Sequence, residues 1–486
     1  MHTESPQKSY QTYRSLPELA GLTSMDRAIH ADWSLEESVS RLKRLHYCLR
    51  RMHEVFSEKI TSEPIYELKT AFSFHSYLCA EQVDLIRRRV SEMREPPLGL
   101  DKEPDGSLVT LFEELSGTTE TLEFLIGLYE VVLPAVLRAC EHLKNDAHPL
   151  ADAPTVRVAK LIGFELEPMV EFGQKAIECL RDESVEDAAD SWQRHLSVFL
   201  KLSGDLDGLQ TCPSMEVPPL RYPKKQTSYR REPRRDERFV DSFNAGVNPE
   251  AFLYDTAFCP QDKTLMMYYK RLRELDVPEM MATILVDLRE AEPWGFHMEM
   301  SRQLWDEARH AMMGEVGFAS LGIDWTQIPI NFTWSRNLNL QLEARERHGV
   351  LFFIEQGLMP RTGKRYEWEV ASESGDPLSA LFQDFDWADE VLHAQIGRRW
   401  YVPKYRDLKE ALGYGDRCWS KVLSHWRDDL ESGRTDHRNW WPDLYRQACK
   451  VWGKEPDAAA IGFRETYEAK RADLESLVDS TPDETS

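Results

Sequence analysis

Apolar residues recur three and four positions apart over long stretches of this chain, which is the pattern of amphipathic helices. In the first half the pattern covers four segments, 35–56, 67–93, 118–143 and 154–180. In the second half it runs from about 264 to 399 and reappears at 416–430 and 442–452. No segment shows the sustained alternation of a strand, so the sequence predicts an all-α protein.

Proline, arginine and lysine interrupt the helical pattern from about residue 211 onward. We therefore expect four parts: an amino-terminal helical bundle without metal at 1–210, a Pro/Arg-rich linker at 211–262, a four-helix bundle at 263–403, and C-terminal helices with an acidic tail at 404–486. The basic run from Arg221 to Arg238 could bind a phosphate-bearing partner. Docking against the protein's own acidic surfaces fits this acidic chain better.

Composition narrows the class of protein. With 42% hydrophobic and 29% charged residues over 486 positions, the chain is typical of a globular protein of more than one domain. Its net charge of −23 argues against nucleic-acid and anionic-membrane partners. The eight cysteines form no C-x-x-C pair, and neither a signal peptide nor a long apolar span occurs. We expect a cytoplasmic protein, for which a homodimer is one compatible state.

Two short motifs in the second half carry the chemistry. Of the fourteen histidines, only His310 and His393 follow a glutamate by three residues, Glu307 and Glu390 respectively. This spacing puts both side chains on one helix face, where they can grip one metal ion. Both motifs read Asp-Glu-x-x-His, and their separation suits the second and fourth helices of one bundle. A di-iron carboxylate bundle needs one further glutamate from each of the other two helices.

For the first helix we expect the ligand Glu279. Residues at equal distance from a hairpin turn share the same depth, and the turn at Pro293 lies about a dozen residues before Glu307. Glu279 is the carboxylate nearest to the matching depth, whereas Glu290 and Glu292 would be ~13 Å too shallow. The alternative for Glu279 is a solvated acid near the start of a helix, where the dipole favours it.

For the third helix we expect Glu355, which is embedded in the apolar run VLFFIEQGLM. A buried carboxylate is costly unless it is paired or binds metal. Glu343 and Glu346, beside several basic residues, are typical of a solvated face, and a solvent-facing Glu355 at the helix end is the alternative to a ligand. Asp306 and Asp389 precede the motif glutamates and could accept the outer N–H of a ligand histidine on a neighbouring helix.

The strings DEVLHAQIGRRWY and PWGFHMEMSRQLWDEARHAMMG, with the Glu-Gln-Gly-Leu segment between them, resemble an uncharacterised ferritin-like family related to rubrerythrins and to the tRNA hydroxylase bundle. The resemblance covers about Asp262 to Pro403. It implies a ferritin-like four-helix bundle. It also implies a set of six metal ligands: Glu279, Glu307, His310, Glu355, Glu390 and His393.

Oxygen and nitrogen ligands without thiolate suit two iron ions, with manganese as a second choice. We therefore expect a non-haem di-iron oxidoreductase, an O2-dependent oxidase or oxygenase acting on a small organic substrate. Its electrons would come from an external donor, because no flavin or iron–sulfur motif is present. One alternative is a ferroxidase or peroxide scavenger, against which the missing C-x-x-C pair argues. The other is a metal-free helical scaffold.

Overall fold

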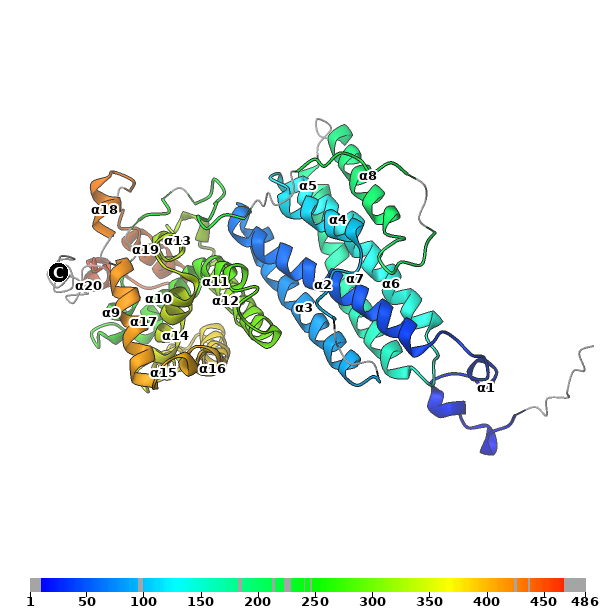
Figure 1. The fold of residues 1–486 in the computed structure, drawn as a ribbon. Coiled ribbons are helices and arrows are strands. Elements are labelled where there is room, and N and C mark those ends of the chain that lie inside the picture. Colours follow the sequence, from blue (N-terminus) through cyan, green and yellow to red (C-terminus); the bar gives the residue numbers. More distant parts are fainter. Residues whose placement is uncertain are drawn as a thin grey trace, which may run out of the picture. The chain divides into compact units, whose positions relative to one another are not determined.

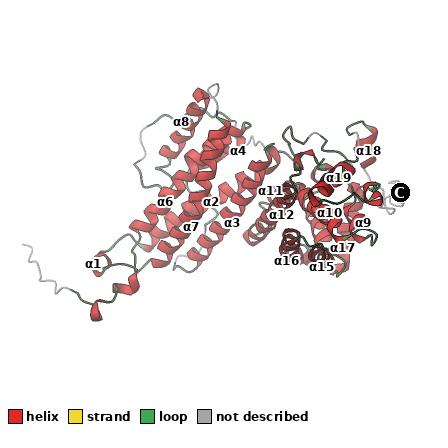
Figure 2. Cartoon of the chain, turned by 180° about the vertical axis from the view of Figure 1, so that it is seen from behind, coloured by secondary structure: helices red, strands yellow, loops and turns green. Residues whose placement is uncertain are grey.

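The computed structural model describes residues 10–94, 99–181, 186–211, 215–222, 229–239, 241–244, 247–423, 426–435 and 438–466. In these residues all regular secondary structure is helical, as Figures 1 and 2 show. A single β-bridge, between Val247 and Thr466, joins no strand there. The all-α prediction is thus confirmed, while the expected acidic tail lies outside the described residues.

The chain divides into two compact units. The first comprises Met1–Val55 and Leu78–Ser228, and the second comprises Phe56–Tyr77 and Tyr229–Ser486. The second unit therefore includes a segment that the sequence-based boundary at 210 assigned to the first bundle. Within this segment α2 ends at Ser62 and α3 begins at Tyr66, with the same helical pattern on either side, so composition gave no sign of the division.

The first unit is built from long helices, some of them shared with the second unit. Helix α6 packs along α7, and α8 packs against α4 and η3. The helices are α1 (Met25–Ala28), α2 (Leu35–Ser62), α3 (Tyr66–Ser91), α4 (Gly106–Gly117), α5 (Thr121–Leu125), the π-helical η3 (Ile126–Val132), α6 (Leu133–Asp146), α7 (Ala153–Leu180) and α8 (Glu186–Leu202). Two short 3-10 turns, η1 (Tyr13–Ser15) and η2 (Glu18–Gly21), precede them.

The second unit contains the remaining helices. They are α9 (Pro249–Tyr254), α10 (Pro260–Arg273), α11 (Asp276–Asp287), α12 (Trp294–Ser320), η4 (Trp325–Gln327), α13 (Thr333–Gln341), α14 (Ala344–Gly357), α15 (Lys364–Glu373), α16 (Pro377–Trp400), η5 (Val402–Lys404), α17 (Leu408–Leu423), α18 (Trp426–Glu431), α19 (Trp441–Trp452) and α20 (Ala458–Ile461). Aromatic residues dominate one part of its core, where Tyr268, Tyr269, Trp441 and Tyr445 are fully buried.

Helices α10 to α16 form the bundle that positions the site. The long α12 packs on α10, α11 and α16, while α14 packs on α11, α16 and α17. Helix α15 packs on α10 and α16. The bundle has four helical segments: α10 with α11, α12, α14 with α15, and α16. Two of them are interrupted. A turn at Glu274 and Leu275 separates α10 from α11, and a short loop after Gly357 separates α14 from α15.

Described basic residues of the expected linker contact the protein's own carboxylates. Arg238 donates to both oxygens of Glu67 at 2.7 Å, within the second unit. Arg231 lies 2.9 Å from Asp287 in the same unit. These contacts follow the docking interpretation of the basic run, of which residues 223–228 lie outside the described part.

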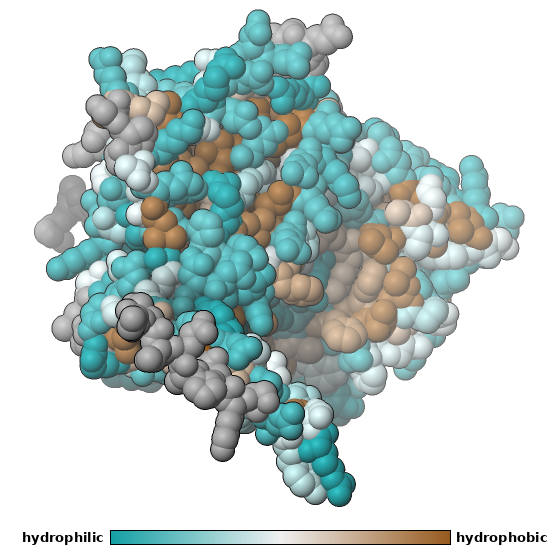
Figure 3. Space-filling model, turned by 90° about the vertical axis from the view of Figure 1, so that its right-hand side faces the viewer, coloured by the Kyte–Doolittle hydropathy of each residue, from teal (hydrophilic) through white to brown (hydrophobic). Residues whose placement is uncertain are grey.

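On the face that Figure 3 shows, hydrophilic side chains surround several groups of hydrophobic ones. Exposed apolar side chains are usual on globular proteins. Among the described residues, no helix is long and apolar enough to cross a membrane.

The contact between α10 and α12 leads to a test of the packing. A Cβ atom added at Gly314 would lie 2.2 Å from the backbone nitrogen of Leu272, which cannot move without displacing α10. We expect Gly314→Ala to lower the free energy of unfolding by about 1–3 kcal/mol. Thermal melts measure the effect, with Gly357→Ala as control because a Cβ there meets nothing within 4 Å. An unchanged melt for Gly314→Ala would contradict this packing.

Candidate metal centre

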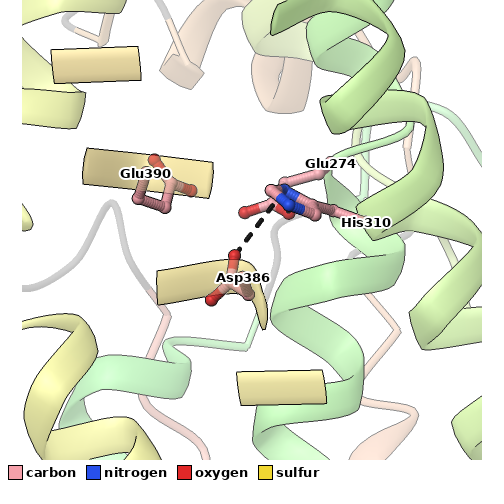
Figure 4. Close-up of side chains that lie close together, drawn as sticks. All are labelled: Glu274, His310, Asp386 and Glu390. Atoms are coloured by element: carbon pink, nitrogen blue, oxygen red, sulfur yellow. Dashed lines mark ion pairs between the residues drawn. The ribbon is translucent and has the colours of Figure 1, made fainter. Parts of the chain in front are cut away.

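Two groups of acidic and imidazole side chains meet inside the second unit. One, here the Glu355 group, consists of Glu307, Glu355, Glu390 and His393. The other, the Glu274 group, consists of Glu274, His310, Asp386 and Glu390 (Figure 4). In each group, one oxygen or nitrogen atom of every residue lies within 4.8 Å of those of the others. Because Glu390 belongs to both groups, the two form one continuous cluster.

Helices α12 and α16 supply the centre of the cluster with the same spacing. Glu307 and His310 lie one helical turn apart on α12, and Glu390 and His393 repeat this arrangement on α16. Both pairs are buried, because residues three apart share one helix face. The outer members come from helix ends: Glu274 caps the C-terminus of α10, and Glu355 lies in the last turn of α14.

Several buried ligand-type atoms in this cluster have no hydrogen-bond partner among the described residues. They are Oε1 of Glu307, Oε2 of Glu390 and Nδ1 of His393 in the Glu355 group, and Oε2 of Glu274 and Nδ1 of His310 in the Glu274 group. Nδ1 of His393 approaches Oε1 of Glu307 to 3.2 Å and Oε2 of Glu390 to 3.5 Å. Leaving such atoms unsatisfied costs about 1–3 kcal/mol each. A cation bound between them would remove that cost, so the donor set fits a metal ion.

Two aspartates hold the histidines from outside the cluster. Asp389 lies 3.1 Å from Nε2 of His310, and Asp306 lies 3.4 Å from Nε2 of His393, each on the helix opposite its histidine. Arg309 donates to both aspartates, at 2.7 Å to Asp306 and 2.6 Å to Asp389. With Nε2 as the hydrogen-bond donor, Nδ1 of each ring is left to face the cluster. This is how outer carboxylates orient histidine ligands.

Burial and crowding shift the titration of the Glu355 group. Burial raises the pKa of Glu355 well above its ordinary value, and the negative charges of Glu390 and Glu307 raise it further. Burial lowers the pKa of His393, but the surrounding carboxylates outweigh this effect and bring that pKa well above its ordinary value. Both residues therefore hold protons in the absence of metal. A cation bound here would displace them, so its affinity falls as the pH is lowered.

The Glu274 group differs because two buried cations contact it. Nζ of Lys364 lies 2.9 Å from Asp386 and 3.0 Å from Glu390. Arg271 pairs with Asp386 and lies 2.9 Å from Glu274. Neither side chain is exposed to solvent. Protein cations thus already balance part of the acidic charge where a second metal ion would bind.

Five of the six expected ligands lie in this cluster, but Glu279 does not. Its carboxylate pairs with Lys69 and accepts a hydrogen bond from Ser335 at 3.3 Å, while Arg235 lies 3.8 Å away. The sequence argument counted equal distances on both sides of Pro293 and so pointed to a residue five positions after Glu274. In the structure, α11 already ends at Asp287 and α12 begins at Trp294. Glu274 lies 13 residues before the end of α11, and Glu307 lies 13 residues after the start of α12.

Other members of the site have weaker signals in the sequence. Asp386 precedes Glu390 by four residues and so lies on the same face of α16, a spacing that could have pointed to it. No local pattern marks Arg271 or Lys364, since their contacts depend on tertiary packing. Glu346, the other candidate in the third helix, instead closes a capping box with Glu343 at the start of α14.

A cavity of about 120 Å³ reaches the cluster. Its wall includes carboxylates of both groups, and the rest is mainly apolar. The lining residues are Arg273, Glu274, Asp276, Val277, Met280, Glu307, Ser335, Leu338, Val350, Leu351, Ile354, Glu355, Leu358, Glu390 and Trp419. A mainly apolar wall with a few converging polar groups is typical of small-molecule sites.

The assignment of Glu274 in place of Glu279 can be tested with two isosteric variants. We expect Glu274→Gln to lower the metal bound per chain, because it removes one ligand charge from the cluster. Glu279→Gln should leave metal content unchanged and lower the melting temperature, since it leaves Lys69 buried without its partner, a loss of about 3–5 kcal/mol for a buried pair. Elemental analysis and thermal melts separate the two effects. Metal loss in Glu279→Gln alone would restore the original ligand set.

The buried lysine leads to a prediction about the second metal ion. The Lys364 ammonium occupies carboxylate oxygens that a cation in the Glu274 group needs. Lys364→Met should therefore strengthen binding of the second Mn²⁺ equivalent by at least about tenfold. Free Mn²⁺ measured by electron paramagnetic resonance during titration gives both affinities. The control is Lys409→Met, at an exposed position of α17. Equal second-site affinity in wild type and Lys364→Met would show that the lysine does not compete.

Comparisons with known proteins gave no match for this chain, whether against protein-family models, curated proteins or solved structures. The resemblance to ferritin-like proteins therefore stays a prediction. The case for a function rests on the geometry of the cluster and its cavity.

Proposed function

We propose that this chain is a non-haem di-iron oxidoreductase that uses O2 to oxidise a small organic substrate. The observation that carries the proposal is the pair of buried ligand groups sharing Glu390, with five ligand-type atoms left without hydrogen bonds in the described residues. Mixed carboxylate and imidazole ligation without thiolate suits iron, and manganese as a second choice. The resemblance of the two Asp-Glu-x-x-His strings to ferritin-like proteins points the same way.

In this proposal the residues of the Glu355 group and of the Glu274 group, with Glu390 common to both, would hold the metal ions. Two iron ions bound there would supply O2 activation, which amino-acid side chains cannot perform. Asp306 and Asp389 keep each histidine in the tautomer that presents Nδ1 to the cluster. Electrons would come from an external donor, as no redox group is encoded in the sequence itself.

The cavity favours an organic substrate over iron or peroxide. Its aliphatic wall, formed among others by Leu338, Val350 and Leu351, leads to the carboxylates of Glu307, Glu355 and Glu390. A ferroxidase or peroxide scavenger needs only an opening for a small polar reactant. An apolar chamber beside the ligands instead excludes water and holds carbon against the reacting centre.

The alternative function is a metal-free scaffold, which the buried cations beside the Glu274 group favour. Arg271 and Lys364 can balance Asp386 and Glu390 without any ion. In the Glu355 group, Lys364 contacts only the shared Glu390, and the protons held by Glu355 and His393 supply the remaining compensation. Buried ligand-type atoms of Glu307, Glu390 and His393 that lack hydrogen bonds in one place are hard to explain in a scaffold.

The shared ligand gives the sharpest test. We expect purified full-length protein, reconstituted anaerobically with Fe²⁺, to bind two irons per chain and to consume O2 when a reductant and substrate are present. Glu390→Ala should lose both irons, because it removes a ligand from each group. Its metal-free form should melt within a few degrees of metal-free wild type, since Lys364 keeps Asp386 as a partner and repulsion among the acids is relieved.

The matched control is Glu373→Ala, an exposed acid on α15. Iron analysis, optical spectra under O2 and thermal melts report the outcome. Wild-type protein that binds no iron after reconstitution would refute the proposal. A large loss of stability in metal-free Glu390→Ala would instead mark Glu390 as a structural residue.

A further inference from the structure

One acid in the cavity wall has no hydrogen-bond or close ion-pair partner among the described residues. Asp276, at the start of α11, is only 6% exposed and lines the cavity. Of the surrounding basic groups, Arg273 and Arg235 attract its carboxylate only through their charge, without a contact within ion-pair distance. Burying a carboxylate with so little compensation is costly, so a sequence that keeps one here needs a reason.

The charges around the cavity show what could satisfy Asp276. Five carboxylates and one guanidinium line the wall. Four of the five belong to the two ligand groups, which leaves Asp276 as the acid without a role in the proposed metal site. The guanidinium of Arg273 lies 3.9 Å from Glu250 and 5.9 Å from the ring centre of Tyr269. The cavity therefore attracts a cation more than an anion.

We propose that this cavity binds a small primary amine, with its ammonium group paired to Asp276 and its hydrocarbon body against the aliphatic wall. The aliphatic wall is formed by Val277 and Met280 on the same helix as Asp276, by Leu338 on α13, and by Val350, Leu351 and Ile354 on α14. The inference deepens the proposed function, on which it rests for the statement that this amine is the substrate.

Physical chemistry distinguishes an amine from its neutral and acidic analogues. An ammonium–carboxylate hydrogen bond is roughly twice as strong as a neutral one, and low local dielectric strengthens it further. An alcohol of equal length keeps the apolar contacts but lacks the charge. A carboxylic acid anion of equal length would face five acids. The order of affinity should therefore be amine, alcohol, carboxylate.

Isothermal titration of the metal-free full-length protein tests this order without any need for turnover. The probes are hexylamine, hexan-1-ol and sodium hexanoate. We expect hexylamine to bind at least about tenfold more tightly than hexanol, and hexanoate to bind most weakly. Equal affinity for amine and alcohol, or a preference for hexanoate, would overturn the inference.

Two variants locate the binding site. Asp276→Asn keeps the shape of the side chain and should lower amine affinity to that of the alcohol, whereas Asp384→Asn, an exposed acid on α16, removes the same charge elsewhere and should change nothing. Ile354→Trp should weaken the amine and the alcohol alike by filling the cavity. An amine preference that survives Asp276→Asn, or binding unaffected by Ile354→Trp, would contradict the assignment.

Iron analysis of the same preparations separates this inference from the proposed function. Protein that binds iron but shows no amine preference would leave the metal centre in place and overturn the amine site. Protein that prefers the amine but binds no iron would keep the binding site and overturn the oxidoreductase.

Discussion

Five carboxylates and two imidazoles share the interior of one helical bundle, and their mutual repulsion is the constraint on which the rest of the second unit depends. Four of these groups alone would cost many kcal/mol if they were all charged and unpaired. The protein reduces this repulsion in three ways. Some acids keep their protons, as Glu355 does, and buried cations such as Lys364 pair with others. Neutral polar groups lie beside the remaining acids. A bound metal would be a fourth way.

Compensation differs between the two groups, and one position on the two central helices shows how. At the position four residues before the motif glutamate, α12 carries Gln303 and α16 carries Asp386. Gln303 is neutral and donates to Glu355 at 3.1 Å. Asp386 adds a negative charge, and it is on this side that Arg271 and Lys364 are buried. The group with the additional carboxylate is thus the one that contacts both buried protein cations.

Prediction from sequence succeeded where a pattern is local. Helix periodicity gave the helical class, and i,i+3 spacing brought out Glu307, His310, Glu390 and His393, because both depend on neighbours one turn away. Glu355 could be predicted from its apolar sequence context. Glu279 lies outside the cluster, because depth across a hairpin depends on where each helix ends, which the turn residues alone did not reveal.

The remaining parts of the site could not be read from the sequence, for a related reason. Lys364 begins α15 and Arg271 lies in the last turn of α10, and only tertiary packing brings both to Asp386. The position of the cavity likewise depends on helices as far apart in sequence as α10 and α17.

The breaks between α10 and α11 and between α14 and α15 give the cluster an electrostatic contribution that comes from the backbone and not from any side chain. Glu274 caps α10 and Glu355 lies in the last turn of α14, so two helix C-termini end at the cluster. A helix C-terminus carries about half a negative charge from its free carbonyl groups, worth about 0.3–1 kcal/mol toward a nearby cation. Each break also begins a new helix, α11 at Asp276 and α15 at Lys364, and the dipole of a helix N-terminus has the opposite sign. The fold thus places helix ends of both signs near the acids, and this backbone part of the electrostatic field does not titrate.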